Sequence, residues 1–191
     1  VVSVALVVVM ANSYTMEARP VWDTPLLWLY YLANAVLSGA LVCAALAGVR
    51  RPTDAGSAAG SAGVRLVLTV ALAGTALTLI ALVAYAVFIP AQAAAFTSVG
   101  NYFDPTHPTK VMADPQGALA GFLTGDQAGL FWAGALVIGA LVPGALAFLA
   151  RKREGATLAA MAAVGVLCAL AGGICFRMVL YALGFTVFVF Y

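Results

Sequence analysis

The residues best suited to chemistry in this 191-residue chain include an arginine that lies inside an apolar run near the C-terminus. This is Arg177, and Tyr181 follows it by four residues, so the two side chains share one face of a helix. A guanidinium inside an apolar segment is costly and therefore indicates a site. Arg177 could hydrogen-bond a quinone oxygen or pair with an acidic group of a partner. The alternative is a structural role, with its aliphatic stem carrying the charge to the membrane surface.

A second group of candidate residues lies in the turn ANSYTMEARPVWDTPLLWLYY, residues 11–31, between two apolar runs. Within it we single out Tyr14, Arg19 and Trp22. Tyr and Trp rings can pack on a partner while their polar tips remain hydrogen-bonded, and Arg and Trp are frequent in interface hot spots. These three residues, together with Arg177 and Tyr181, are our candidate quinone or partner contacts. The alternative is that the turn residues only cap and shape a connector.

Other catalytic and metal chemistry finds little support in the sequence. There is no nucleophile–base pair, no glycine-rich phosphate loop and no pair of carboxylates within an apolar run. The one histidine, His107, stands between two prolines, whereas a membrane haem b usually needs two axial histidines. The three cysteines, Cys43, Cys168 and Cys175, lie in apolar runs without a CxxC pattern. We therefore predict neither haem nor metal in this chain.

The composition indicates a protein whose main solvent is lipid. Hydrophobic residues make up 64% of the chain and charged residues only 8%, against about a quarter charged in a soluble domain. The nine basic residues are not gathered on one face with aromatic residues, which argues against nucleic-acid binding.

The hydrophobic pattern predicts an all-α fold, a polytopic membrane helix bundle with four complete transmembrane helices plus an N-terminal partial one. Each complete span needs about 20 apolar residues. The whole chain, 1–191, reads as a single transmembrane domain that begins inside a helix, as the C-terminal part of a larger protein would. The expected spans are the partial helix 1–12, then 25–49, 64–89 with an extension past Pro90 to 96 as an alternative, 127–150 with a kink at Pro143, and 157–183.

The distribution of basic residues predicts the orientation. Two loops on the same side of the bundle, residues 50–63 with the adjacent Arg65 and residues 151–153, hold six of the nine basic residues. The positive-inside rule places these loops in the cytoplasm. The turn after residue 12, the loop 97–126 and the C-terminus are then expected outside.

The order of the motifs resembles the dimethyl sulfoxide reductase anchor subunit family. The resemblance is carried by WDTP at the start of the second helix, by AQAAAFTSVGNYFDP after the third, by GDQAGLFWAGALV at the entry to the fourth, and by GGICFRMVLYALG in the last. It covers the whole chain as the C-terminal portion of an eight-helix anchor.

The resemblance implies a multi-pass subunit of the bacterial cytoplasmic (inner) membrane. Such a subunit anchors a molybdopterin catalytic subunit and an iron–sulfur subunit, binds menaquinol and passes electrons to the iron–sulfur subunit, without haem. The family's best-known quinol residues, a histidine and an acidic residue, belong to N-terminal helices that have no counterpart here. Two other functions stay open: a fragment of a small-solute transporter built around a midplane site, and a purely structural anchor.

Overall fold

The computed structural model describes residues 2–49, 58–96 and 114–186, and helices account for most of them. No strand occurs in these ranges. The elements in chain order are α1 (Val2–Asn12), α2 (Pro25–Val49), α3 (Ala58–Ala91), the 3₁₀-helix η1 (Gln92–Phe96), α4 (Pro115–Ala120), the π-helix η2 (Leu130–Leu141), α5 (Val142–Ala150) and α6 (Gly155–Ala182).

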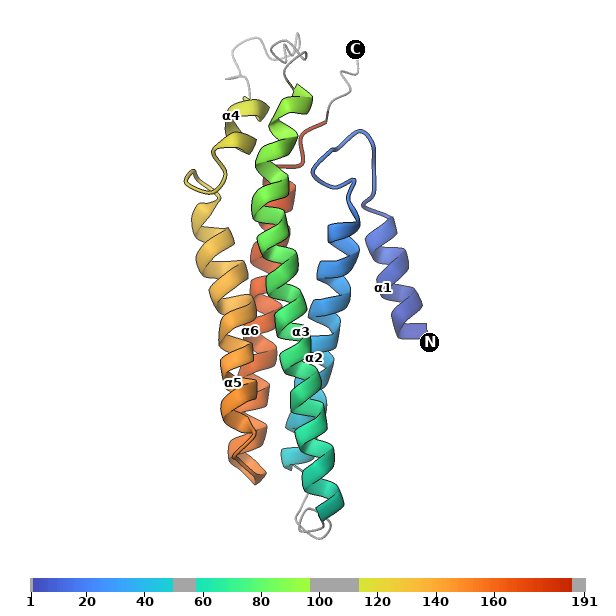
Figure 1. Cartoon of the computed structure of the whole chain (residues 1–191), viewed down its shortest axis with the longest axis vertical. Coiled ribbons are helices and arrows are strands. Elements are labelled where there is room, and N and C mark those ends of the chain that lie inside the picture. The colour runs from blue at the N-terminus through green and yellow to red at the C-terminus, as the bar shows by residue number, and fades with distance from the viewer. Residues whose placement is uncertain (1, 50–57, 97–113, 187–191) are drawn as a thin grey trace.

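Four segments are long and apolar enough to cross a membrane: Pro25–Val49, Ala62–Phe96, Leu130–Ala150 and Gly155–Ala182. They run side by side as an elongated bundle, and α1 lies along the first half of α2 (Figure 1). The all-α membrane bundle predicted from the sequence is therefore confirmed. Pro25 occupies the first turn of α2, where a missing N–H costs nothing.

The third span differs from its simplest prediction at both ends. It passes Pro90 and continues through η1 to Phe96, which was the predicted alternative. At its start, residues 58–63 belong to α3, although the sequence suggested that they form part of a Ser/Gly/Ala-rich loop. Alanine has the highest helix propensity, and residues that extend an existing long helix avoid the cost of nucleating a new one. The small residues 58–63 can therefore join α3 as its first turns.

The fourth span changes its helical geometry midway. Residues Leu130–Leu141 form a π-helix, and the α-helix resumes at Val142, immediately before Pro143. The N–H of Val142 donates to the carbonyl of Val137, five residues earlier. In a regular α-helix the Pro143 ring would clash with the carbonyl of Gly139, so a widened turn before the proline relieves that clash. The irregularity predicted at Pro143 therefore takes the form of a change in helix type.

The short helix α4 was not predicted from the sequence. Asp114 accepts a hydrogen bond from the backbone N–H of Gly117 at 2.9 Å, and Pro115 takes the first helical position. This Asp-Pro start is a helix signal. It was overlooked because the six-residue helix carries no hydrophobic period of its own.

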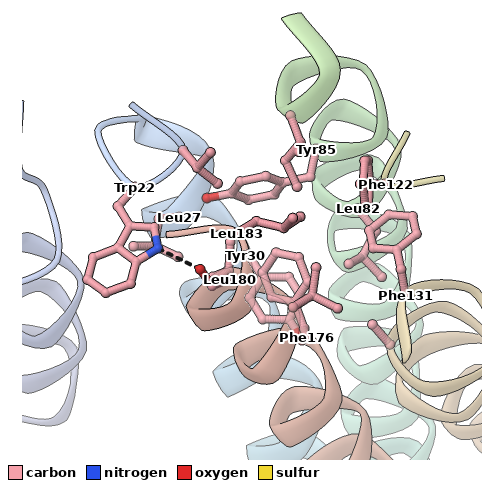
Figure 2. Close-up of a cluster of buried hydrophobic side chains, with 14 of the residues drawn as sticks. Trp22, Leu27, Tyr30, Leu82, Tyr85, Phe122, Phe131, Phe176, Leu180 and Leu183 are labelled. Carbon is pink, nitrogen blue, oxygen red and sulfur yellow. Dashed lines mark hydrogen bonds between the residues drawn. The ribbon is translucent and has the colours of Figure 1, made fainter. Parts of the chain in front are cut away.

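The core of the bundle divides into two parts. Large aromatic side chains fill the half nearest the turn between α1 and α2: Tyr30 from α2, Tyr85 from α3, Phe131 from η2 and Phe176 from α6 (Figure 2). Alanine and leucine residues fill the other half. The rings of Tyr30 and Phe176 lie 4.2 Å apart between centroids, and those of Tyr85 and Phe176 lie 5.0 Å apart. Through these ring contacts, Phe176 of α6 packs on Tyr30 of α2 and also reaches Tyr85 of α3, in the half of the bundle nearest the turn.

The two ends of the bundle carry different chemistry. The turn after α1 and the helix α4 lie at one end, which we call the turn end, and the α5–α6 connection lies at the opposite end (Figure 1). This connection contains Arg151, Lys152 and Arg153, and it defines the basic end. The side of the membrane that each end faces stays a prediction, namely that the basic end is cytoplasmic.

This orientation can be tested with two exposed positions. We expect Lys152→Cys to react with a membrane-impermeant maleimide only from the cytoplasmic side and Asp126→Cys only from outside. Cys43, Cys168 and Cys175 would first be replaced by alanine. Mass-tag labelling of intact cells and of inverted vesicles provides the measurement, and the opposite labelling pattern would reverse the assigned sides.

Candidate functional site

The five residues singled out in the sequence meet at the turn end, where the turn after α1 lies against the last part of α6. Arg177 and Tyr181 lie one helical turn apart on α6, and Tyr14 and Trp22 approach them from the turn. Arg19 lies over the Trp22 ring. We refer to Tyr14, Arg19, Trp22, Tyr31, Arg177 and Tyr181 as the turn-end cluster. Tyr31 is the member that sequence reasoning missed.

Arg177 joins the turn to α6 through phenol groups. Its Nη2 donates a hydrogen bond to Tyr14 Oη at 2.8 Å. Its guanidinium carbon lies 5.2 Å from the ring centre of Tyr14 and 5.8 Å from that of Tyr31. Both distances are within the range of cation–π attraction. The signal for Tyr31 was its place nearly two turns into α2, at the level of Arg177.

The Tyr14 hydroxyl is shared between two partners. Besides accepting from Arg177, it lies 3.0 Å from Tyr181 Oη, and either phenol can be the donor in that bond. Tyr181 is 53% exposed and is the part of this network that a molecule from outside can reach. A chain of one guanidinium and two phenols can therefore present an O–H donor at the surface of the bundle.

Trp22 is a structural part of the cluster. Only 5% of it is exposed, and its Nε1 donates to the carbonyl of Leu180 at 2.8 Å (Figure 2). Its ring makes edge contacts with Tyr14 and Tyr181 at centroid distances of 5.6 and 5.5 Å. The bond to Leu180 satisfies a carbonyl in the last turn of α6, where intrahelical partners run out. That Trp22 also contacts a ligand or partner stays a prediction.

Arg19 covers the Trp22 ring from the outer side, with its guanidinium carbon 4.3 Å from the ring centre. Glu17 and Asp23 flank it in the turn, and both are exposed. The outer surface of the turn therefore carries both charge signs above an aromatic base. This arrangement suits docking of a polar protein surface better than burial in lipid.

The space enclosed by the cluster is small. A recess of about 10 Å³ is lined by seven residues that include Tyr14, Tyr31 and Arg177. This is close to the volume needed for one water molecule, whereas pockets for small molecules usually have hundreds of cubic ångströms. A quinone ring can therefore only contact the rim at Tyr181, or enter by displacing a side chain. The Nε of Arg177 is buried beside this recess without a hydrogen-bond partner.

The rest of the described chain adds no metal-binding group. No cluster of three or more His, Cys, Asp or Glu side chains able to hold a metal ion occurs among residues 2–49, 58–96 and 114–186. His107 lies outside the described residues, and the expected lack of haem and metal stays a prediction. Comparisons of the chain with models of protein families, with curated proteins and with solved structures found no match.

Proposed function

We propose that this chain is the membrane anchor subunit of a respiratory molybdopterin oxidoreductase complex in a bacterial cytoplasmic membrane. In this proposal its turn end receives an iron–sulfur subunit, which in turn holds the molybdopterin catalytic subunit. The observation that carries the proposal is the joining of a charged turn to the last span through Arg177 and Tyr14. A simple connector between two membrane helices needs no charges of either sign and no bond to a distant helix.

The proposed electron donor is menaquinol, bound with its headgroup at the rim of the turn-end cluster. Oxidation of the quinol releases two electrons, which pass to the iron–sulfur subunit, and two protons, which leave on the same side. Tyr181 supplies an exposed phenol and Arg177 a fixed positive charge. Both can hydrogen-bond a quinone oxygen. The aromatic rings around them suit contact with the quinone ring.

A purely structural anchor is the second candidate, and the small recess favours it. An anchor that only holds a partner at the membrane needs no cavity for a quinone. The transporter reading finds less support, because the polar side chains Asn34, Ser38, Thr75 and Thr78 bond within their own helices. Part of their hydrogen-bonding capacity is therefore used within the helix, which leaves less of it for a solute at the midplane.

Co-purification from the native membrane tests the proposal. The affinity-tagged protein should bring down an iron–sulfur subunit and a molybdenum-containing subunit, with iron, molybdenum and menaquinone detected in the product. A preparation with iron and molybdenum but without quinone-dependent reduction would favour the structural anchor. A protein that purifies alone, while a second tagged membrane protein from the same cells retains its partners, would overturn the proposal.

A further inference from the structure

At the basic end, an arginine at the end of one span reaches across to another span. Arg151 follows the last residue of α5, and its Nη2 donates to Thr69 Oγ1 of α3 at 2.6 Å. The same Thr69 hydroxyl donates to the carbonyl of Arg65 at 2.8 Å. The hydroxyl thus acts as acceptor and donor at once, and it orients the exposed Arg151 side chain across the α3–α5 junction.

This junction gathers positive charge. Arg65 and Thr69 are one helical turn apart, so Arg65 lies on the same face of α3 that receives Arg151. Lys152 and Arg153 follow directly, and all four basic residues are exposed. Glu154 is the nearest acidic residue along the chain. Basic residues on both helices of one junction attract an anion to it.

The surface next to these arginines, toward the membrane core, is apolar and uncovered. On α3, Leu66 is 66% exposed and Val70 is 40% exposed. On α5, Phe148 is 59% exposed and Leu149 is 56% exposed. Cations at the membrane surface beside exposed apolar side chains match the two halves of a phospholipid, with its phosphate outside and its acyl chains within.

We propose that Arg65 and Arg151, the latter positioned by Thr69, form a binding site for the phosphate of an anionic phospholipid, whose acyl chains lie along the exposed residues of α3 and α5. Arginine is suited to this ligand because its planar fork of N–H groups contacts two phosphate oxygens at once. The bond to Thr69 fixes this fork in advance, which reduces the entropy lost when the lipid binds. This site lies at the opposite end of the bundle from the turn-end cluster and does not depend on the proposed electron-transfer function.

Lipid retention by the purified full chain tests this site. The protein would be reconstituted in phosphatidylcholine vesicles with and without phosphatidylglycerol, extracted in neutral detergent, and analysed for bound lipid by native mass spectrometry. The wild-type chain should retain phosphatidylglycerol in preference to phosphatidylcholine. Arg151→Ala should reduce that preference about tenfold or more, the effect expected when a charged hydrogen-bond donor to the phosphate is lost.

The controls separate a built site from general attraction to positive charge. Arg153→Ala removes the same charge two residues away but leaves the bond between Arg151 and Thr69, so it should reduce the preference much less. Thr69→Val changes no charge, yet it should weaken retention because it frees the Arg151 side chain. This variant also keeps the test informative if Arg151→Ala fails to fold.

Three outcomes would overturn the proposal. The first is no preference for phosphatidylglycerol in the wild-type chain, and the second is an equal loss in the Arg151→Ala and Arg153→Ala variants. The third is full displacement of the bound lipid by inorganic phosphate, which would assign the site to a soluble phosphate compound. Retention that resists inorganic phosphate and depends on both Arg151 and Thr69 is the supporting result.

Discussion

Gly172→Ala should destabilise the bundle by about 3 kcal/mol or more, whereas Gly173→Ala should have almost no effect. A Cβ atom at Gly172 would collide with the backbone of Gly139 on η2, and a Cβ at Gly139 would lie 2.7 Å from the Cα of Gly172. Backbone atoms cannot turn aside as a flexible side chain can, so the two helices would have to separate. Overpacking of this kind costs about 1–3 kcal/mol where side chains can adjust, and more where they cannot.

The adjacent glycine provides a matched control. A Cβ at Gly173 would meet only Asn34 Nδ2 at 3.6 Å, which is an ordinary contact. Alanine is also a better helix former than glycine by about 1 kcal/mol, so Gly173→Ala can be slightly stabilising. Unfolding of each variant by titration with sodium dodecyl sulfate in mixed micelles gives the comparison. Equal midpoints for the two variants would show that the helices do not approach at Gly172 as the structure has them.

These two glycines illustrate what the sequence could and could not predict. Length and hydrophobicity were sufficient for the four spans, because about 20 apolar residues are what a membrane crossing requires. The sequence does not distinguish Gly172 from Gly173. The rotation of α6 in the bundle decides which of the two faces η2, and the sequence does not specify that rotation. The π-helix could not be predicted either, since Pro143 indicates an irregularity but not its form.

The candidate site shows the same division. The order of the spans and the rise of a helix, about 1.5 Å per residue, were sufficient to place the turn and Arg177 at one end of the bundle. The sequence could not predict that Arg177 bonds Tyr14, a residue 163 positions earlier in the chain, or that Tyr31 joins them. It also presented Trp22 as a surface contact, whereas the ring is almost wholly buried. Aromatic residues at a membrane boundary serve packing and recognition equally well, so their type alone does not separate the two roles.

The burial of Trp22 determines how the proposed function is best tested by mutation. Trp22→Ala would remove a core side chain together with the bond to Leu180, so a loss of activity in that variant would not distinguish docking from folding. Arg19→Ala removes only the cation above the ring. We therefore expect Arg19→Ala to preserve the membrane level of this chain and to weaken its binding of the catalytic subunit about 30-fold, as for an interface hot spot. Arg153→Ala, at the basic end, should leave the bound catalytic subunit at its wild-type amount.

Arg177→Ala should instead separate quinol oxidation from assembly. Loss of a hydrogen bond from a charged donor costs about 1.5–3 kcal/mol, which corresponds to a fall of about 10- to 150-fold in the rate of quinol-dependent reduction. The amount of catalytic subunit bound at the membrane should fall much less, because Arg19 and the outer surface of the turn remain.

Tyr181→Phe should give a smaller fall in the rate of quinol-dependent reduction, since it removes the exposed hydroxyl but leaves the Arg177–Tyr14 bond. The measurements are the bound catalytic subunit, by immunoblot of washed membranes, and the rate of oxidation of a soluble menaquinol analogue. Wild-type values of both quantities in Arg19→Ala and Arg177→Ala would contradict both proposed roles. The turn would then be only a connector, and the Arg177 side chain would extend to the membrane surface only to keep its charge solvated.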